Sequence, residues 1–182
     1  MAVKVTSSGI SLDEVIVPLI SGAVHYWRLE RKVWERALDG VLEMGFSVIE
    51  TYIPWSVHEI SRGQFDFGTV DPRKDIDAFM DLCEAKGLHL IVRPGPHINA
   101  ELTYFGYPKR IIADAGIQAR TAYGTPAILP VFPRMFPVPS YASSRLYEEL
   151  EIYFNALQPI LRRHIHPKGC VIAIQSEKSS PS

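Results

Sequence analysis

The sequence predicts an α/β fold, a partial (β/α)8 TIM barrel whose first four βα units form one domain over residues 1–182. Three observations predict this fold. Short apolar runs typical of buried parallel strands alternate with segments of helical periodicity. A unit of helix end, glycine, strand and proline-bearing polar loop occurs twice, as EMGFSVIETYIPW from Glu43 and EAKGLHLIVRPGP from Glu84. Polar residues also gather where the strands end, as Arg93, His97, Asn99 and Glu101 do after Leu88–Val92, which suggests a binding or catalytic surface.

A doubly wound open sheet is the alternative α/β architecture. Its first strand-to-helix turn is expected to carry a glycine-rich phosphate fingerprint, and Gly22 stands alone at that place. The barrel is therefore preferred. A complete barrel takes about 250 residues, so we expect the N-terminal half of one, truncated, in this chain of 182 residues.

The first two expected strands flank a helix with a clear apolar face. Val15–Ile20, interrupted by Pro18, is the first expected strand. Lys32–Met44 carries apolar residues at three- and four-residue spacing, and Gly45 ends this helix. Phe46–Tyr52 then forms the second strand.

The second helix is expected to begin at Asp71, where an N-cap acceptor is followed by a proline, and to end at Gly87. Leu88–Val92 is a short apolar run and forms the third strand. Residues 104–140 contain six prolines and no sustained period. A loop of this length in a compact domain is usually a lid or a binding wall.

The last expected helix begins at Ser143 or Ser144 and is kinked by Pro159. Cys170–Gln175 forms the fourth strand. The two cysteines, Cys83 and Cys170, lack the spacing of a metal site or a disulfide framework, so we expect buried thiols.

Composition excludes several classes of partner. The net charge of −1 offers no general attraction to nucleic acid or to an anionic membrane. No apolar run reaches membrane-spanning length, and acidic residues lie where a signal peptide would have its apolar core. We therefore expect a cytoplasmic protein without nucleic-acid or membrane partners and without a cofactor.

Right-handed crossovers bring the carboxyl ends of all strands to one mouth of a barrel. The residues expected there are His25, Tyr52, Trp55, His97, Asn99, Glu101, Gln175 and Glu177. Carboxylates and amides exchange hydrogen bonds with hydroxyls, and aromatic rings offer flat apolar faces, so this lining suits a neutral sugar. The competing interpretation is that Tyr52 and Trp55 only pack at the rim of the barrel.

The histidines offer a weaker indication of a site. His164 and His166 lie at a helix end and are expected to be solvated rather than to bind a metal. A metal-dependent barrel hydrolase would have to use His25 and His97, and the expected metal content is none.

Four motifs in order, SGAVHYWR, ETYIPWSVHE, GQFDF and RPGPHINAE, closely resemble the β-galactosidases of glycoside hydrolase family 35. The resemblance spans nearly the whole chain and corresponds to the first half of that family's catalytic barrel. It implies that Tyr52, Asn99, Ala100 and Glu101 hold the hydroxyls of a terminal β-galactosyl unit. Many members have Tyr and Cys where this chain has His97 and Asn99.

The chain departs from the family pattern near its end. Gln175 and Glu177 match, but Lys178 replaces an Asn and Ser179 occupies the position of the acid/base Glu. The family's nucleophilic Glu belongs to a later strand that this sequence lacks. Retaining hydrolysis needs two carboxyl groups about 5–5.5 Å apart. Glu177 could be proposed as a substitute acid, but it lies two residues short of the catalytic position.

The leading hypothesis is thus a β-galactosidase-type glycosidase represented by an inactive N-terminal fragment, with a non-native ending after Glu177. The alternative is a non-catalytic sugar-binding or self-associating half barrel. Its first and fourth strands would be unpaired edges. Two copies could then form a homodimer through those exposed sheet edges.

Overall fold

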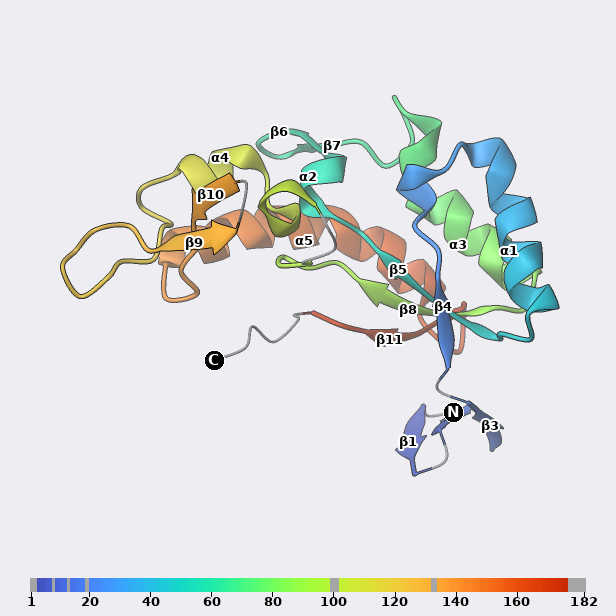
Figure 1. Cartoon of the computed structure of the whole chain (residues 1–182). Coiled ribbons are helices and arrows are strands. Elements are labelled where there is room, and N and C mark those ends of the chain that lie inside the picture. The colour runs from blue at the N-terminus through green and yellow to red at the C-terminus, as the bar shows by residue number, and fades with distance from the viewer. Residues whose placement is uncertain are drawn as a thin grey trace.

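The structure is a computed structural model, and it describes residues 3–7, 9–12, 14–18, 20–98, 102–131 and 134–176. Its centre is a parallel sheet of four strands, β4 (Ser21–Ala23), β5 (Val48–Tyr52), β8 (His89–Arg93) and β11 (Val171–Ile174). In space the strands follow their order in the sequence (Figure 1). A doubly wound sheet would reverse that order at a switch point. No reversal occurs among these four strands.

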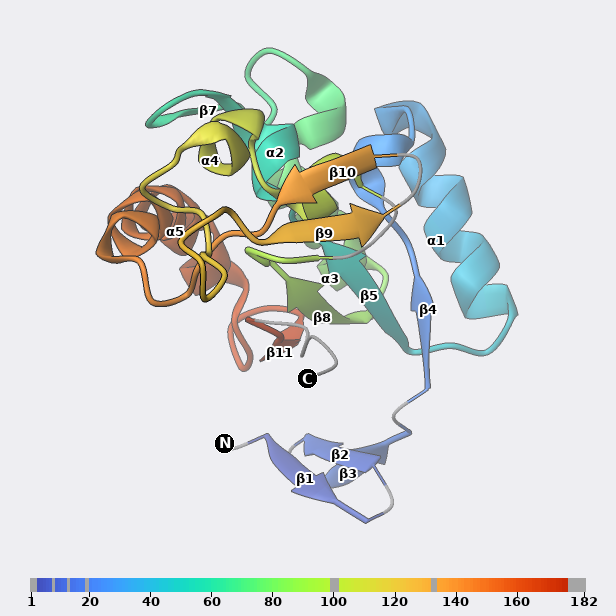
Figure 2. The ribbon, with the colours of Figure 1, turned by 60° about the vertical axis from the view of Figure 1, so that its left-hand side comes forward.

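Three helices cover one face of the sheet: α1 (Trp34–Glu43), α3 (Ile76–Ala85) and α5 (Ser144–His164). α3 packs against both α1 and α5, and Figures 1 and 2 show all three on the same side of the strands. The helix faces that meet the sheet are fully or almost fully buried and include Trp34, Leu38, Phe79, Met80, Tyr153 and Leu157. The structure is therefore a mixed α/β fold with its crossover helices on a single face.

A side-chain cap sets the start of α3, and the predicted start of this helix is wrong. Asp71 accepts a hydrogen bond from the Arg73 amide and caps only a short 3-10 helix, Pro72–Lys74. α3 begins one turn later, where Asp75 accepts from the amide of Ala78 at 2.9 Å. The sequence offers two N-cap acceptors four residues apart, Asp71 and Asp75. The first, next to the proline, caps the 3-10 turn, and the second caps α3.

The predicted cap of the last helix is confirmed at Ser143, whose hydroxyl accepts from the amide of Leu146 at 3.4 Å. Pro159 lies inside α5, and the helix continues through it to His164. Cys83 and Cys170 are buried free thiols, as predicted.

The first predicted strand is wrong in part. Val15–Val17 (β3) belongs to a separate antiparallel sheet with β1 (Lys4–Thr6) and β2 (Gly9–Leu12). Pro18 ends β3, and the first strand of the parallel sheet is the short segment Ser21–Ala23. These three small residues give no apolar signal in the sequence.

The N-terminal sheet packs on the amino-terminal part of the parallel sheet (Figure 1). Ile10, Leu12 and Val17 are buried against Val48 of β5 and Ile172 of β11. This face is opposite the one that the helices cover. Because the N-terminal sheet packs near the starts of the strands, it does not cover their carboxyl ends.

The segment predicted to be irregular has secondary structure. It contains a 3-10 helix at Thr103–Gly106, α4 (Lys109–Ala113) and an antiparallel pair formed by β9 (Ile128–Val131) and β10 (Arg134–Pro137). Prolines are tolerated in this pair because a two-stranded sheet consists of edge strands only. Before it lie α2 (Trp55–His58) and the pair β6 (Glu59–Ser61) and β7 (Gln64–Phe65).

None of the helices in the described part of the chain is both long and apolar enough to cross a membrane.

Candidate sugar-binding site at the carboxyl ends of the strands

Arg93 is the centre of the polar groups at the carboxyl ends of the parallel strands. It is the last residue of β8, and the strand register places Tyr52 of β5 directly beside it. Its guanidinium pairs with Glu50 at 2.7 Å, donates from Nε to Gln175 Oε1 at 2.8 Å and donates from Nη1 to the Tyr52 hydroxyl at 3.1 Å. One side chain thus joins three adjacent strand ends.

Charge in this cluster is balanced. The Arg93 side chain is 10% exposed and that of Glu50 is 22% exposed, and their opposite charges meet directly. A buried ion pair needs further hydrogen bonds to its remaining donors, which Tyr52 and Gln175 provide. The cluster therefore offers hydrogen-bonding groups without a net charge.

An aromatic stack continues from Arg93 along the strand ends. The guanidinium lies 4.7 Å from the centre of the Tyr52 ring, and the Tyr52 ring stacks on His25 with a centroid distance of 4.3 Å. Trp27 follows at 5.9 Å from His25, and Arg28 lies 4.6 Å above Trp27. These half-buried rings form a wall beside the polar cluster.

Of the residues predicted to bind sugar, the structure describes Tyr52. Asn99, Ala100 and Glu101 lie outside the described residues, as do Glu177 and Ser179. The ends of the segment that carries the first three are nevertheless defined. The amide of Ile98 donates to the carbonyl of Phe105 at 2.9 Å.

Two residues after the predicted binding motif, Tyr104 and Phe105, have a strained backbone. Tyr104 and Phe105 have φ angles of 56° and 54°, in the left-handed region that side-chain-bearing residues rarely adopt. Both rings pack edge-on against Phe136 of β10, each at 5.3 Å. Such strain persists only where packing enforces it and is concentrated at functional sites. The β9–β10 pair therefore fixes the loop that follows the predicted binding motif.

Trp55 does not line the site, contrary to the prediction. Its side chain is fully buried and stacks on Tyr153 of α5 at 5.3 Å, while its indole nitrogen donates to Glu59. Glu59 in turn holds Arg110 at 2.6 Å, and Arg110 also pairs with Glu149. The aromatic position after β5 is thus part of the core, as the competing interpretation held for Trp55.

His58, in the same motif, also has a structural role. Its ring lies between the Tyr26 hydroxyl at 2.6 Å and the carbonyl of Asp66 at 2.8 Å. Burial lowers the pKa of His58 to about 4, so the ring is neutral. Nδ1 donates to the carbonyl and Nε2 accepts from the tyrosine.

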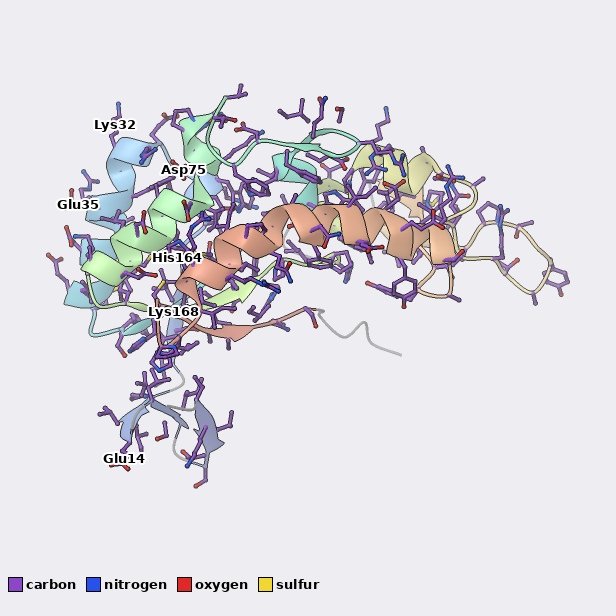
Figure 3. All side chains as sticks on the ribbon, turned by 180° about the vertical axis from the view of Figure 1, so that it is seen from behind. Glu14, Lys32, Glu35, Asp75, His164 and Lys168 are labelled. Atoms are coloured by element: carbon purple, nitrogen blue, oxygen red, sulfur yellow. The ribbon has the colours of Figure 1, made fainter. Side chains whose placement is uncertain are left out.

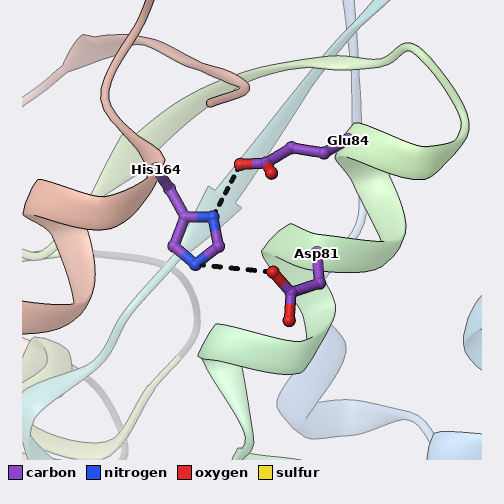
Figure 4. Close-up of side chains that lie close together, drawn as sticks. All are labelled: Asp81, Glu84 and His164. Atoms are coloured by element: carbon purple, nitrogen blue, oxygen red, sulfur yellow. Dashed lines mark hydrogen bonds and ion pairs between the residues drawn. The ribbon is translucent and has the colours of Figure 1, made fainter. Parts of the chain in front are cut away.

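His164 is not solvated, which corrects the prediction for this residue. It is 3% exposed and lies at the end of α5 beside α3 (Figure 3). Nδ1 is 2.6 Å from Glu84, and Asp81 lies 4.0 Å from Nε2 (Figure 4). Nε2 is also 2.8 Å from Asp77. With a carboxylate at each nitrogen, the ring donates twice and joins the two helices.

Asp81, Glu84 and His164 are close enough together to hold a metal ion. Both ring nitrogens already face carboxylates, however, and a metal ligand must offer a deprotonated nitrogen. His25 and His97 do not join this group. His25 stacks on Tyr52, and His97 packs edge-on against Phe105 at 4.8 Å.

Comparison with known proteins agrees with these motifs. The model of "Glycosyl hydrolases family 35" matches residues 10–125. The chain belongs to this family. An exo-β-D-glucosaminidase of Pyrococcus horikoshii is 31% identical over 176 residues, which are 94% of this chain and 22% of that protein. A β-galactosidase of Xanthomonas manihotis is 33% identical over 159 residues, 87% of this chain and 23% of that protein.

The fold has a solved counterpart. The crystal structure of a β-galactosidase from the psychrophilic Marinomonas ef1 superposes with a TM-score of 0.60 and 16% identity. The match covers 86% of this chain and 21% of that one. This family 35 chain therefore spans between a fifth and a quarter of the length of the proteins named here.

Sequence reasoning placed Arg93 among the polar residues after the third expected strand, but it identified neither Glu50 nor the pairing of the two. Each is a charged residue within an otherwise apolar or neutral strand, a pattern that indicates a buried ion pair. Their pairing depends on the register between β5 and β8, which the sequence of either strand does not specify.

Proposed function

We propose that residues 1–182 form the first four βα units of a (β/α)8 barrel of β-galactosidase type, and that their strand ends bind a terminal β-galactoside. The sequential order of the parallel strands supports the barrel, because neighbouring βα units follow each other around such a fold. Crossover helices on one face support it as well, since a barrel has its helices outside.

The observation that carries the proposed ligand class is the charge-balanced cluster around Arg93. A neutral polyhydroxylated ligand needs donors and acceptors but no compensating charge. Tyr52 and Gln175 supply such groups, and Glu50 cancels the charge of Arg93. The aromatic stack at Tyr52 and Trp27 adds flat surfaces against which the apolar faces of a sugar can pack.

The relatives differ in their named sugars, one being a glucosaminidase and one a galactosidase. An amino sugar carries an ammonium group, which is best bound by a carboxylate without a cationic partner. Glu50 is the carboxylate in the Arg93 cluster, and Arg93 neutralises it. Among the described residues, this arrangement favours the neutral galactoside.

We further propose that the chain by itself does not hydrolyse glycosides. Retaining hydrolysis needs one carboxylic acid and one nucleophilic carboxylate about 5–5.5 Å apart. Glu50 is held by Arg93, and the acid/base position of the family corresponds to Ser179 in the resemblance.

An assay with 4-nitrophenyl β-galactoside tests this proposal. The purified chain and its Glu177→Gln variant should both release nitrophenol only at the rate of a protein-free solution. Turnover by the unmodified chain above that of Glu177→Gln would show that Glu177 acts as the acid and would overturn the proposed inactivity.

A self-associating half barrel remains the second candidate, supported by the edges of the sheet. β4 and β11 are the edge strands of the four-stranded sheet. Beside β11 lies a cleft of about 340 Å³ with apolar walls that include Phe154, Leu161, Ile165 and Ile174. Ile165 and Ile174 are 40% and 45% exposed. A partner surface that covered these apolar side chains would remove them from water.

Sedimentation velocity tests whether the chain self-associates. A dimer whose dissociation is promoted by Ile174→Lys would support self-association through the β11 edge. A monomer at all concentrations tested, with a cooperative unfolding transition, would exclude the homodimer.

A further inference from the structure

Arg93 determines which way its neighbours can hydrogen-bond. A guanidinium has five N–H donors and no acceptor. Tyr52 and Gln175 must therefore accept from it, while Glu50 faces it as an ion pair. The direction of each of these hydrogen bonds is fixed by the chemistry of one partner, independently of where hydrogens are placed.

Because the Tyr52 hydroxyl accepts from Arg93, its own proton is available for a hydrogen bond to another group. The oxygen accepts from Arg93 Nη1 at 3.1 Å, and Arg93 cannot accept in return. No other residue in the described part of the chain makes a hydrogen bond with this hydroxyl. Tyr52 is thus set to donate to an acceptor oxygen of a ligand.

For Gln175 the same contact fixes the amide orientation. Its Oε1 accepts from Arg93 Nε at 2.8 Å, so its amide nitrogen is turned away from the guanidinium. The backbone supports this placement, because the Gln175 amide donates to Val92 O and the Ile53 amide donates to Arg93 O, both at 2.9 Å. Main-chain and side-chain contacts therefore hold the three strand ends together.

A lysine could not replace Arg93 in this role. Arg93 pairs with Glu50, donates to Tyr52 and Gln175, and has its Cζ atom 4.7 Å from the centre of the Tyr52 ring. These contacts use the planar fork of the guanidinium. The lysine ammonium keeps the positive charge but is not planar and cannot contact all three partners at once. Arg93→Lys therefore tests the geometry of the guanidinium separately from its charge.

We propose that Arg93 is a positioning residue for a neutral sugar: it makes Tyr52 a hydrogen-bond donor and fixes the amide of Gln175. This inference rests on the proposed sugar site. It assigns the ligand an acceptor oxygen, such as a hydroxyl or ring oxygen, opposite Tyr52. It does not require Arg93 to touch the sugar.

The test uses NMR of the isotopically labelled 182-residue chain in three forms: unmodified, Arg93→Lys and Arg120→Lys. Arg120 is the matched control, because its exposed guanidinium bonds only to carbonyls of its own loop, those of Ala115 and Gly124. Each form is measured first without ligand, by the ring signals of Tyr52 and the side-chain amide signals of Gln175. Each is then titrated with methyl β-D-galactoside.

Arg93→Lys should shift the Tyr52 and Gln175 side-chain signals without ligand and raise the Kd for the galactoside about tenfold, the effect of one hydrogen bond. Arg120→Lys should change neither. Unchanged Tyr52 and Gln175 signals in Arg93→Lys would overturn the inference. If the unmodified chain does not bind the galactoside, the proposed function fails, and the ligand-free comparison still decides the role of Arg93.

Tyr52→Phe provides a second approach if Arg93→Lys does not fold. Phe keeps the stack with His25 and leaves the Arg93 contacts with Glu50 and Gln175 in place. The Gln175 signals should stay, while the Kd should rise about tenfold because the donor is lost. An unchanged Kd in a variant of a chain that does bind the galactoside would overturn the inference.

Discussion

His164 is held between carboxylates of a neighbouring helix. Burial by itself lowers the pKa of His164, but the hydrogen bonds to Glu84 and Asp77 outweigh it and raise the pKa above its ordinary value. Glu84 also accepts from the amide of Cys170 at 3.1 Å. His164 and Glu84 together therefore join α5, α3 and the start of β11.

A raised pKa gives a defined pH dependence. The stabilisation by His164 is complete below the unfolded pKa of about 6.5 and is lost as the pH rises through the higher folded value. Urea unfolding should show the free energy of unfolding falling as the pH increases above about 6.5. His164→Gln should cost about 1–3 kcal/mol at pH 6 and flatten this dependence. A variant that keeps the slope would refute the assignment.

His58 gives the opposite dependence. Burial lowers its pKa to about 4, so its contribution is complete above the unfolded pKa of 6.5 and is lost as the pH falls towards 4. The loss over this window should be about 3 kcal/mol. Titration of His58 by NMR in the folded chain checks the cause directly. A folded pKa near 6.5 would contradict it.

The residues of the site illustrate what local sequence can and cannot specify. Tyr52 was predicted from its place after an apolar strand, and the structure puts it in the polar cluster. Trp55 follows three residues later in the same motif and is core, because the chain turns into α2 and directs it towards α5. His164 looked solvated because its partners Glu84 and Asp77 lie about 80 residues away in the sequence.

At the scale of elements, the start of α3 depends on its N-cap residue, Asp75. Asp75 accepts from the amide of Ala78 and also pairs with Arg31 at 2.8 Å. Asp75→Ala should lower the free energy of unfolding by about 1–2 kcal/mol. Asp71→Ala is the control, because Asp71 caps only the exposed 3-10 turn. Equal losses in urea unfolding would argue against Asp75 as the effective cap.

The elements with a strong apolar period could be predicted from the sequence, and those without one could not. α1 and α5 bury continuous faces, and the predicted range of α1 and the predicted start of α5 lie within two residues of the structure. β4 was missed because Ser21–Ala23 has no apolar side chain beyond Ala, and its pairing depends on β5. The β9–β10 pair was missed because its prolines indicate a loop.

At the scale of the whole molecule, the small N-terminal sheet completes a second core. Val17 of β3 is 8% exposed in contact with this core, whereas Val15 in the same strand is 66% exposed. Val17→Ala should destabilise the chain by about 1–3 kcal/mol, and Val15→Ala should change stability by less than about 0.5 kcal/mol. Thermal unfolding of the two variants compares them. Equal effects would mean that the N-terminal sheet does not pack on the strands.

The two faces of the parallel sheet have different tasks. One face and its three helices hold the main core, while the other carries the N-terminal sheet at one end and the Arg93 cluster at the other. This separation leaves hydrogen-bonding groups where the strands end, as in enzymes built on βα units. The proposed function assigns sugar recognition to this cluster and leaves the complete chemistry outside it.

The most direct measurement is a calorimetric titration of the chain with methyl β-D-galactoside, repeated with Tyr52→Phe. We predict saturable binding that weakens about tenfold in the variant. Absence of saturable binding, or equal affinity in the variant, would contradict a β-galactoside site at the carboxyl ends of these strands.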